Sequence, residues 1–389
     1  MRFLFNSTGD YGHFHPLAFL ANALVARGHE VRFGTEQRFA DRVAAAGFEV
    51  VALPDRKPTI GSEEYLAWME QLEGKDLITL APAILGWFWQ GAVCAQSALS
   101  TEVERWRPDV IVNEQTAWAG VLAARLAGLP YVTFHFRPAP PGILEALLGE
   151  QIATDLEAIG LEGDPSLVLS DPHLALLGAP DGWFTADEFG PTSRLIRPPL
   201  FDGGDVESPD WLDSLGVERP LVYVTMGTVF NSDTALFKTI IEALLDRDID
   251  AVVTVGPKRP GSVAAEDLGE LPGRIRIEEY LAQSLVLPRA SAVVAHGGYG
   301  TLMGALEQGL PVACIPQAAL DNQQNAQSLA RLGAGVFVEE VSRAAIGAAI
   351  TSVLDDPAIR SSARSAAESI ARLPDADRAA QLIEEVAGR

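Results

Sequence analysis

A glycine-rich turn near residue 296 is the clearest sign of chemistry in the sequence. Ala295-His296-Gly297-Gly298-Tyr299-Gly300-Thr301 follows a short apolar run and precedes a helical pattern. Glycines let the backbone approach a phosphate, and exposed N–H groups with the helix dipole stabilise its charge. His296 adds a side-chain donor. The turn therefore predicts a diphosphate site, although a tight turn with a capping histidine gives the same pattern.

A second turn of this kind lies near the start of the chain, at Gly9-Asp10-Tyr11-Gly12-His13-Phe14-His15-Pro16. An alcohol is a poor nucleophile at neutral pH, and an imidazole that titrates near pH ~6.5 can remove its proton. Both His13 and His15 are candidates for this role. Either could instead be an ordinary loop histidine that bonds to the backbone.

The elements around these turns alternate between apolar strands and helices. Strands are predicted at 2–6, 30–33, 48–52, 109–112, 131–134, 221–225, 251–255, 274–277, 292–295 and 312–315. Helices are predicted at 17–27, 38–46, 117–127 and 234–245. This rhythm is typical of doubly wound parallel sheets, so the fold class is α/β. Between residues 54 and 106 the pattern breaks into helical segments rich in aromatics, and a second irregular stretch covers 138–187. Both are interpreted as insertions.

Length and composition restrict the class of protein. A chain of 389 residues favours two domains, and the net charge of −23 argues against nucleic acid and anionic membrane partners. The two cysteines, Cys94 and Cys314, predict neither a disulfide framework nor a zinc site. No apolar run is long enough for a signal peptide or a membrane span, so a cytoplasmic protein is expected.

Four segments together resemble glycosyltransferase family 1, especially its bacterial natural-product enzymes. The segments are His296–Thr301 (HGGYGT), Tyr280-Leu281-Ala282-Gln283, Val224-Thr225-Met226-Gly227-Thr228-Val229-Phe230-Asn231 and Asp321-Asn322-Gln323-Gln324-Asn325-Ala326. The similarity covers essentially the whole chain. It implies the GT-B fold, in which two Rossmann-like domains face a central cleft.

The resemblance also implies how the chain is divided. Residues 1–205 are expected to bind the acceptor, and 219–370 the nucleotide sugar. A Pro/Gly-rich stretch, which includes Pro198, Pro199, Gly203 and Gly204, precedes a linker placed at 206–218. Residues 371–389 are expected to form a helix that crosses back to the first domain.

The activity implied is inverting transfer of a sugar from a thymidine or uridine diphosphate donor to a hydroxyl of a small apolar acceptor. No metal or other cofactor is expected, and the protein is expected as a monomer or homodimer. Other GT-B enzymes (a nucleotide-sugar epimerase or a cell-wall sugar transferase) and a non-catalytic nucleotide-sugar-binding partner are the alternatives. A nicotinamide oxidoreductase is disfavoured because residues 8–12 lack the glycine spacing that its cofactor needs.

Each site residue follows from a matching motif of the family. His13 matches the catalytic base, and Glu114 stands where the family usually has the aspartate that supports it; an ordinary polar loop residue is the other interpretation of Glu114. The residues expected to bind the diphosphate are His296, Gly298, Gly300, Thr301 and Thr228. Those expected at the nucleobase and ribose are Tyr280, Leu281, Gln283 and Gly256. Asp321 and Asn322, in place of the family's Asp-Gln, are expected at the sugar, and Asp321 could also cap a helix.

Aromatic residues in the insertion suggest an acceptor pocket. Trp68, Trp87 and Phe88 are candidates, with His135 after the strand at 131–134. Plain core packing and a membrane-contacting helix are the alternatives. Asp248 and Asp250 have the spacing of a metal-binding pair but are interpreted as a solvated turn.

Overall fold

The computed structural model describes residues 1–72, 77–136, 142–166, 172–188, 190–200, 207–227, 232–256, 258, 262–316 and 320–388. The chain forms two compact units. Unit 1 comprises Met1–Ala179, Phe184–Phe201 and Leu373–Arg389, and unit 2 comprises Pro180–Trp183 and Asp202–Arg372. No helix among the described residues is long and apolar enough to cross a membrane.

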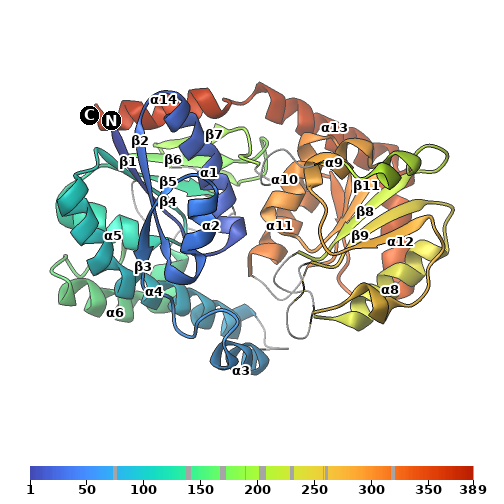
Figure 1. The fold of residues 1–389 in the computed structure, drawn as a ribbon, viewed down its shortest axis with the longest axis horizontal. Coiled ribbons are helices and arrows are strands. Elements are labelled where there is room, and N and C mark those ends of the chain that lie inside the picture. Colours follow the sequence, from blue (N-terminus) through green and yellow to red (C-terminus); the bar gives the residue numbers. More distant parts are fainter. Residues whose placement is uncertain are drawn as a thin grey trace. The chain divides into compact units, whose positions relative to one another are not determined.

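Unit 1 is built on a seven-stranded parallel sheet with the order β3-β2-β1-β4-β5-β6-β7 (Figure 1). The strands are β1 (Arg2–Asn6), β2 (Glu30–Glu36), β3 (Glu49–Leu53), β4 (Val110–Glu114), β5 (Tyr131–His135), β6 (Leu174–Gly178) and β7 (Ser193–Ile196). The helices are α1 (Tyr11–Ala26), α2 (Ala40–Ala45), α3 (Glu63–Leu72), α4 (Leu77–Trp106), α5 (Trp118–Ala127), α6 (Ile143–Ala158) and α14 (Ala376–Ala387).

Alternate side chains of β1 supply the two faces of this sheet. Leu4 belongs to the apolar cluster formed with α4, α5 and α6. Phe5 points to the opposite face, where its ring lies 5.2 Å from that of Phe33, which in turn contacts Phe14 of α1. The strand order reverses between β1 and β4, so their carboxyl ends lie side by side at the point where such sheets bind ligands.

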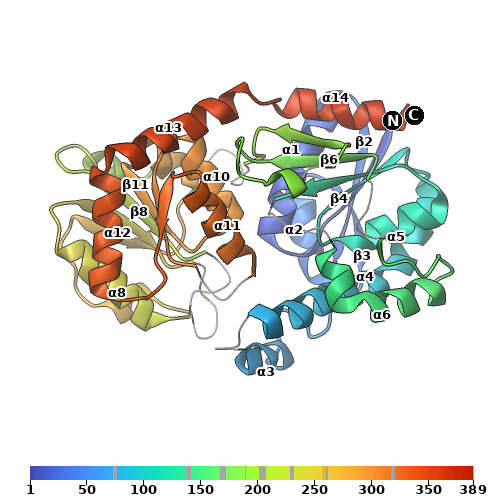
Figure 2. The same ribbon diagram turned by 180° about the vertical axis from the view of Figure 1, so that it is seen from behind.

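The C-terminal helix α14 packs on α1 and on β4, β5 and β6 (Figures 1 and 2). Arg27 at the end of α1 makes ion pairs with Asp377 and Glu384 of α14 at 2.7 and 2.5 Å. His29 Nε2 lies 2.7 Å from the Glu384 carboxylate. These contacts tie the end of the chain to its first helix.

Unit 2 contains a six-stranded parallel sheet with the order β10-β9-β8-β11-β12-β13. The strands are β8 (Leu221–Thr225), β9 (Asp250–Thr254), β10 (Ile275–Glu278), β11 (Ala292–Ala295), β12 (Val312–Cys314) and β13 (Gly335–Phe337). The helices are α8 (Thr234–Leu245), α9 (Gln283–Val286), α10 (Tyr299–Glu307), α11 (Leu320–Arg331), α12 (Arg343–Asp355) and α13 (Pro357–Arg372).

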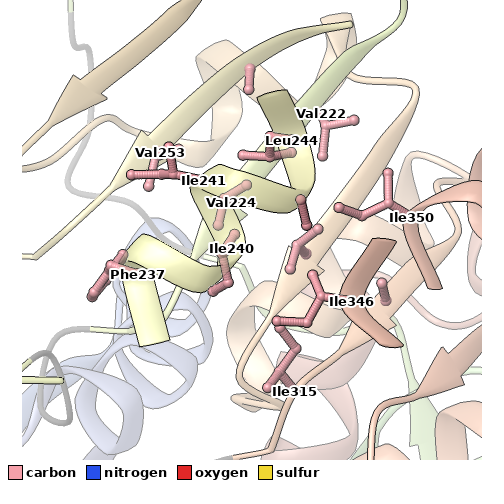
Figure 3. Close-up of a cluster of buried hydrophobic side chains, with 14 of the residues drawn as sticks. Val222, Val224, Phe237, Ile240, Ile241, Leu244, Val253, Ile315, Ile346 and Ile350 are labelled. Atoms are coloured by element: carbon pink, nitrogen blue, oxygen red, sulfur yellow. The ribbon is translucent and has the colours of Figure 1, made fainter. Parts of the chain in front are cut away.

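The core of unit 2 joins α8 and α12 to the same face of the sheet (Figure 3). Asp233 begins α8, because its carboxylate accepts a hydrogen bond from the Leu236 N–H. Ile240 and Leu244 of α8 then meet Val222 and Val224 of β8. This packing fixes the ends of β8 and β11, from which the glycine-rich turn emerges.

Several elements differ from the sequence predictions. The stretch at 138–187 is not a mere irregular insertion, since it contains α6 and the buried strand β6. Helix α1 begins at Tyr11, so His13 lies in its first turn and not in a loop before residue 17. The solvated-turn interpretation is wrong for Asp250, which is buried in β9 and accepts a hydrogen bond from the Gly216 N–H.

Residues 206–218, expected as a linker, belong in part to the body of unit 2. Asp210–Ser214 forms a short 3₁₀ helix, and Arg289 makes an ion pair with Asp213. The contact of Gly216 with Asp250 holds the next segment against β9.

Candidate functional site

A buried histidine–glutamate pair stands at the adjacent ends of β1 and β4. Glu114 is the last residue of β4, and His13 is in the first turn of α1. His13 Nδ1 lies 3.2 Å from Glu114 Oε2 and 3.2 Å from the Thr116 hydroxyl. The Glu114 side chain is fully buried, whereas that of His13 is 19% exposed. The histidine is therefore the member of the pair that a ligand can reach.

Glu114 is held by several hydrogen bonds in addition to its contact with His13. Its Oε1 accepts from the Thr8 N–H at 3.3 Å, and its Oε2 accepts from the Thr116 N–H at 2.7 Å. The Thr116 hydroxyl lies 2.8 Å from Oε2. These donors fix the orientation of the carboxylate, which in turn orients the imidazole.

The two pKa values shift in opposite directions. Burial opposes the charge on Glu114, but His13 and the Thr116 donors outweigh it and lower the pKa of the carboxyl. Burial likewise opposes a charge on His13, but the Glu114 carboxylate outweighs it and raises the pKa of the imidazole. Such an imidazole can take a proton and keep it, which is the requirement for a general base.

Two aromatic rings contact the imidazole of His13. The Phe136 ring is 4.9 Å from the imidazole and nearly perpendicular to it, and the Phe88 ring is 5.7 Å away. Trp87 lies 5.1 Å from Phe88, and Trp68 lies 5.5 Å from Trp87. The structure thus joins these expected acceptor residues into one row that starts at His13.

His15 and Trp89 lie outside this row. His135 is half-buried at the end of β5. His15 packs its ring against Tyr11 and Phe14. Trp89 belongs to the core, where its indole N–H donates to Asp155 at 2.7 Å.

A group of two acids and two arginines holds the turn that leads to His13. Glu36 accepts hydrogen bonds from the Gly9 N–H at 3.3 Å, from Arg56 Nε at 2.5 Å and from Arg38 at 2.8 Å. Arg56 also donates to Asp10 at 3.0 Å. Burial would raise the pKa of the Glu36 carboxyl, but the two guanidinium groups outweigh this effect and lower it.

The glycine-rich turn of unit 2 follows β11 and opens α10. Gly297 has a φ of +95° and Gly227, at the end of the adjacent β8, a φ of +82°, values that favour glycine. A Cβ at Gly298 would lie 2.4 Å from His296 Nε2, and one at Gly297 would lie 2.6 Å from the Asn322 carbonyl oxygen. The turn therefore depends on glycines to pack around His296 and against α11.

The His296 side chain is half-buried, and its Nδ1 atom is buried with no hydrogen-bond partner among the described residues. Burial lowers the pKa of this imidazole, although the charge of Asp321 and a hydrogen bond to the Thr225 backbone act in the opposite direction. The lowered pKa keeps this imidazole neutral at pH 7, so it carries a single N–H.

Neighbouring side chains complete the turn. Gln283 Nε2 donates to the Thr301 hydroxyl at 2.9 Å, and Asn325 donates to the Gly297 carbonyl at 3.0 Å. Asn322 is buried under the turn, whereas Asp321 is half-buried. The first turn of α10, including Gly300 and Thr301, points its backbone N–H groups out of the helix end, where an anion is stabilised.

The other residues expected at the nucleotide lie next to strands and helices of unit 2. Tyr280 is 58% exposed, and Leu281 is buried just before α9. Gly256 follows β9 with a φ of +85°. Thr228 lies outside the described residues. Within the described part of the chain, no three His, Cys, Asp or Glu side chains are grouped so that they could hold a metal ion.

Known proteins are similar to this chain along most of its length. Residues 238–386 match a family described as erythromycin biosynthesis protein CIII-like, C-terminal domain. The elloramycin glycosyltransferase ElmGT of Streptomyces olivaceus is 31% identical, with 98% of this chain and 97% of that protein covered. The L-demethylnoviosyl transferase of Streptomyces niveus is 29% identical, with 96% and 95% covered. The crystal structure of the glycosyltransferase SnogD from Streptomyces nogalater has a TM-score of 0.77 at 27% identity, with 100% and 99% covered.

The chain belongs to the family 1 glycosyltransferases of natural-product biosynthesis. The expectations of an α/β protein with the GT-B fold and of an enzyme that transfers a sugar from a nucleotide donor are confirmed. The roles of individual residues stay predictions.

Sequence reasoning on this glycosyltransferase missed several residues that shape the two turns. Thr116 bonds both members of the histidine–glutamate pair, and its only signal was its position two residues after Glu114. Arg56 and Glu36 are 20 residues apart and read as surface charges. Asn325 lies in the segment 321–326, but nothing in the sequence indicated that its side chain would donate a hydrogen bond to the Gly297 carbonyl.

Proposed function

We propose that unit 1 binds the acceptor and supplies the base, and that unit 2 binds the nucleotide sugar. His13 removes the proton of an acceptor hydroxyl while that oxygen attacks the anomeric carbon. The nucleoside diphosphate leaves from the opposite side, so the anomeric configuration inverts. The observation that carries this proposal is the buried contact of 3.2 Å between His13 Nδ1 and Glu114 Oε2 at the ligand-binding end of the sheet.

Glu114 acts as the positioning partner of the base. A carboxylate at Nδ1 keeps the Nδ1–H tautomer, which leaves Nε2 free to accept the proton of the acceptor. It also stabilises the imidazolium that forms during transfer, in agreement with the raised pKa of His13. Since Glu114 is fully buried, it supports the base and does not touch the acceptor.

The donor diphosphate is assigned to the turn of residues 296–301. The leaving group carries negative charge, which His296, the Thr301 hydroxyl and the N–H groups at the start of α10 can stabilise. Because the Thr301 hydroxyl accepts from Gln283, its own proton is available for a phosphate oxygen. Tyr280, Leu281 and Gly256 are assigned to the nucleoside, a thymidine or uridine, and Asp321 and Asn322 to the sugar. Thr228 keeps its proposed place at the diphosphate on the resemblance of its segment alone.

The acceptor is assigned to the aromatic row of Phe88, Trp87 and Trp68, with His135 nearby. Flat apolar rings next to a base favour a small, largely apolar acceptor that carries a hydroxyl. ElmGT is named as an elloramycin glycosyltransferase, and the Streptomyces niveus protein as an L-demethylnoviosyl transferase. We propose a natural-product acceptor for this chain as well.

A transfer assay with α-linked TDP-glucose and UDP-glucose and a panel of phenols tests the proposal. We expect β-glycosides, recognised by the proton coupling at the anomeric carbon, and a turnover lowered by about 10²–10⁴-fold in His13→Ala. Retention of configuration, or full activity of His13→Ala, would contradict it.

A further inference from the structure

A small cavity lies at the carboxyl ends of β1, β2 and β3, between α4 and the start of α5. Its volume is about 30 Å³, which is room for about two water-sized groups. The residues that matter for its chemistry are Asn6, Ser7, Thr8, Arg56, Phe88 and Thr116. We name this cavity the inner recess. All of its walls belong to unit 1.

Four buried polar atoms of residues that line the inner recess lack a hydrogen-bond partner among the described residues. They are Asn6 Oδ1, Ser7 Oγ, Thr8 Oγ1 and Arg56 Nη1. The four residues are between 2% and 8% exposed. Leaving a buried donor or acceptor unsatisfied costs about 1–3 kcal/mol, so four of them on residues around one cavity favour a polar group that can satisfy them.

The charges around the recess select a neutral ligand group. Arg56 makes ion pairs with Glu36 and Asp10 at 2.5 and 3.0 Å, and Arg38 pairs with the same two acids. Two positive and two negative charges therefore balance. The Glu36 side chain also lines the recess, where it would repel a carboxylate or phosphate. Arg56 Nη1 can only donate, and hydroxyls donate or accept, so a hydroxyl or carbonyl oxygen fits.

Arg56 is held in place before any ligand arrives. Its guanidinium carbon is 4.1 Å from the centre of the Trp87 ring and 4.5 Å from that of Phe88. A Cβ at Gly91 would lie 2.1 Å from the Arg56 Cγ, so only glycine leaves space for this side chain. A fixed donor binds its partner with little loss of side-chain entropy.

The inner recess lies next to the proposed base. Thr116 lines it and also contacts His13 Nδ1 at 3.2 Å. Phe88 lines it too, and its ring is 5.7 Å from the imidazole. A planar molecule against Phe88 can therefore present one oxygen to His13 and another to the recess.

We propose that the inner recess binds one neutral oxygen of the acceptor, a hydroxyl or a carbonyl, through Arg56 Nη1 with help from Ser7 and Thr8. The acceptor class is then a planar compound with a second oxygen besides the one that receives the sugar. This inference rests on the proposed function, because it assumes that unit 1 binds the acceptor.

Binding of three matched probes to the donor-free, full-length protein tests the inference by calorimetry. The probes are 2-naphthol, 2,6-dihydroxynaphthalene and 6-hydroxy-2-naphthoate. A hydrogen bond to a charged donor predicts that the diol binds about tenfold tighter than 2-naphthol. The naphthoate should gain nothing, because its carboxylate would meet Glu36.

Two arginine variants separate the recess from the ion-pair group. Arg56→Lys keeps the charge but removes the Nη1 donor, and it should abolish the advantage of the diol. Arg38 belongs to the same ion-pair group but does not line the recess, so Arg38→Lys should keep the advantage of the diol. Ser7→Ala removes a wall hydroxyl without changing any charge, and it should reduce the advantage even if Arg56→Lys proves unstable.

The inference is overturned if the diol has no advantage in the unchanged protein, if the naphthoate binds best, or if the advantage survives both Arg56→Lys and Ser7→Ala. Sugar transfer tests the proposed function separately. A protein that discriminates the probes as expected but transfers no sugar would support the inference about the recess and contradict the proposed function.

Discussion

The two strand-to-helix turns of this protein carry a half-buried histidine each, yet their surroundings are opposite. In unit 1 the histidine follows the first strand of its sheet, β1, and its partner Glu114 comes from β4. In unit 2 the histidine follows β11, and the first strand of that sheet, β8, contributes Gly227. One histidine thus meets a carboxylate, and the other meets glycine backbone.

This difference sets the chemistry of each turn. The Glu114 carboxylate raises the pKa of His13, so this imidazole readily becomes charged. Burial lowers the pKa of His296, so that imidazole stays neutral. Under the proposed function, one turn serves as a base and the other as an anion site, and the residue at the neighbouring strand end distinguishes them.

The largest expected effect comes from removing the imidazole of unit 1. His13→Ala should lower the turnover of sugar transfer by about 10²–10⁴-fold, the usual contribution of a general base. Its affinity for TDP should stay unchanged, because the diphosphate turn belongs to unit 2. Steady-state kinetics and calorimetry measure the two quantities. His15→Ala is the matched control, and an equal loss in that variant would remove the distinction between the two histidines.

A smaller loss is expected when the carboxylate of unit 1 loses its charge. Glu114→Gln should lower turnover by about 10²-fold and lower the pKa of His13, since the imidazolium loses its main stabilisation. The acid limb of the pH–rate profile should then move to lower pH. Glu102→Gln is the control, because Glu102 is a buried carboxylate paired with Arg32, away from His13. An unshifted acid limb in Glu114→Gln would exclude this role of the carboxylate.

Glycine substitutions sharpen the comparison between the turns. Gly298→Ala places a Cβ 2.4 Å from His296 Nε2, so it should weaken TDP binding about tenfold. Gly12→Ala, in the turn of unit 1, meets nothing within 4 Å and should leave TDP binding unchanged. Calorimetry with TDP measures both. Equal affinities of the two variants would show that the packing around His296 does not matter for the donor.

The smallest effect is expected far from both turns, at α14. Hydrogen bonds from Arg27 and His29 lower the pKa of Glu384 to about 2, so its contribution to stability is present above the pKa of an unfolded glutamate and is lost as the pH falls towards 2. Glu384→Gln should lower the free energy of unfolding at pH 7 by at most about 1 kcal/mol, with turnover unchanged. Denaturant titration at pH 7 and pH 3 measures this, with the exposed Glu385→Gln as control. A loss that is larger at pH 3 would refute the assignment.

The sequence predicted the elements that carry strong local signals. The strands β8 and β11 and the helix α8 have the predicted bounds, because each is a compact apolar run between turn residues. The glycines of the 297–300 turn were also informative, since they are needed for a close backbone approach that few other residues allow.

Other features could not be predicted because they depend on distant contacts. Strands β6 and β7 were missed because they are short and no regular helix was evident around them. The pairing of Arg56 with Glu36 and Asp10 joins residues 20 and 46 positions apart, and charged residues usually read as solvated. The spatial order of strands, which brings the end of β4 beside β1, places Glu114 at His13.

The most direct test of the account compares two pH profiles of the unchanged protein. If His13 is the base and His296 the neutral anion ligand, kcat/KM should fall as the pH drops through a pKa above the usual 6.5 of histidine. The Kd for TDP, once corrected for the titration of TDP itself, should stay constant between pH 8 and 6.5, because His296 does not titrate there. A Kd that follows the same pKa as kcat/KM would contradict the separation of the two histidines.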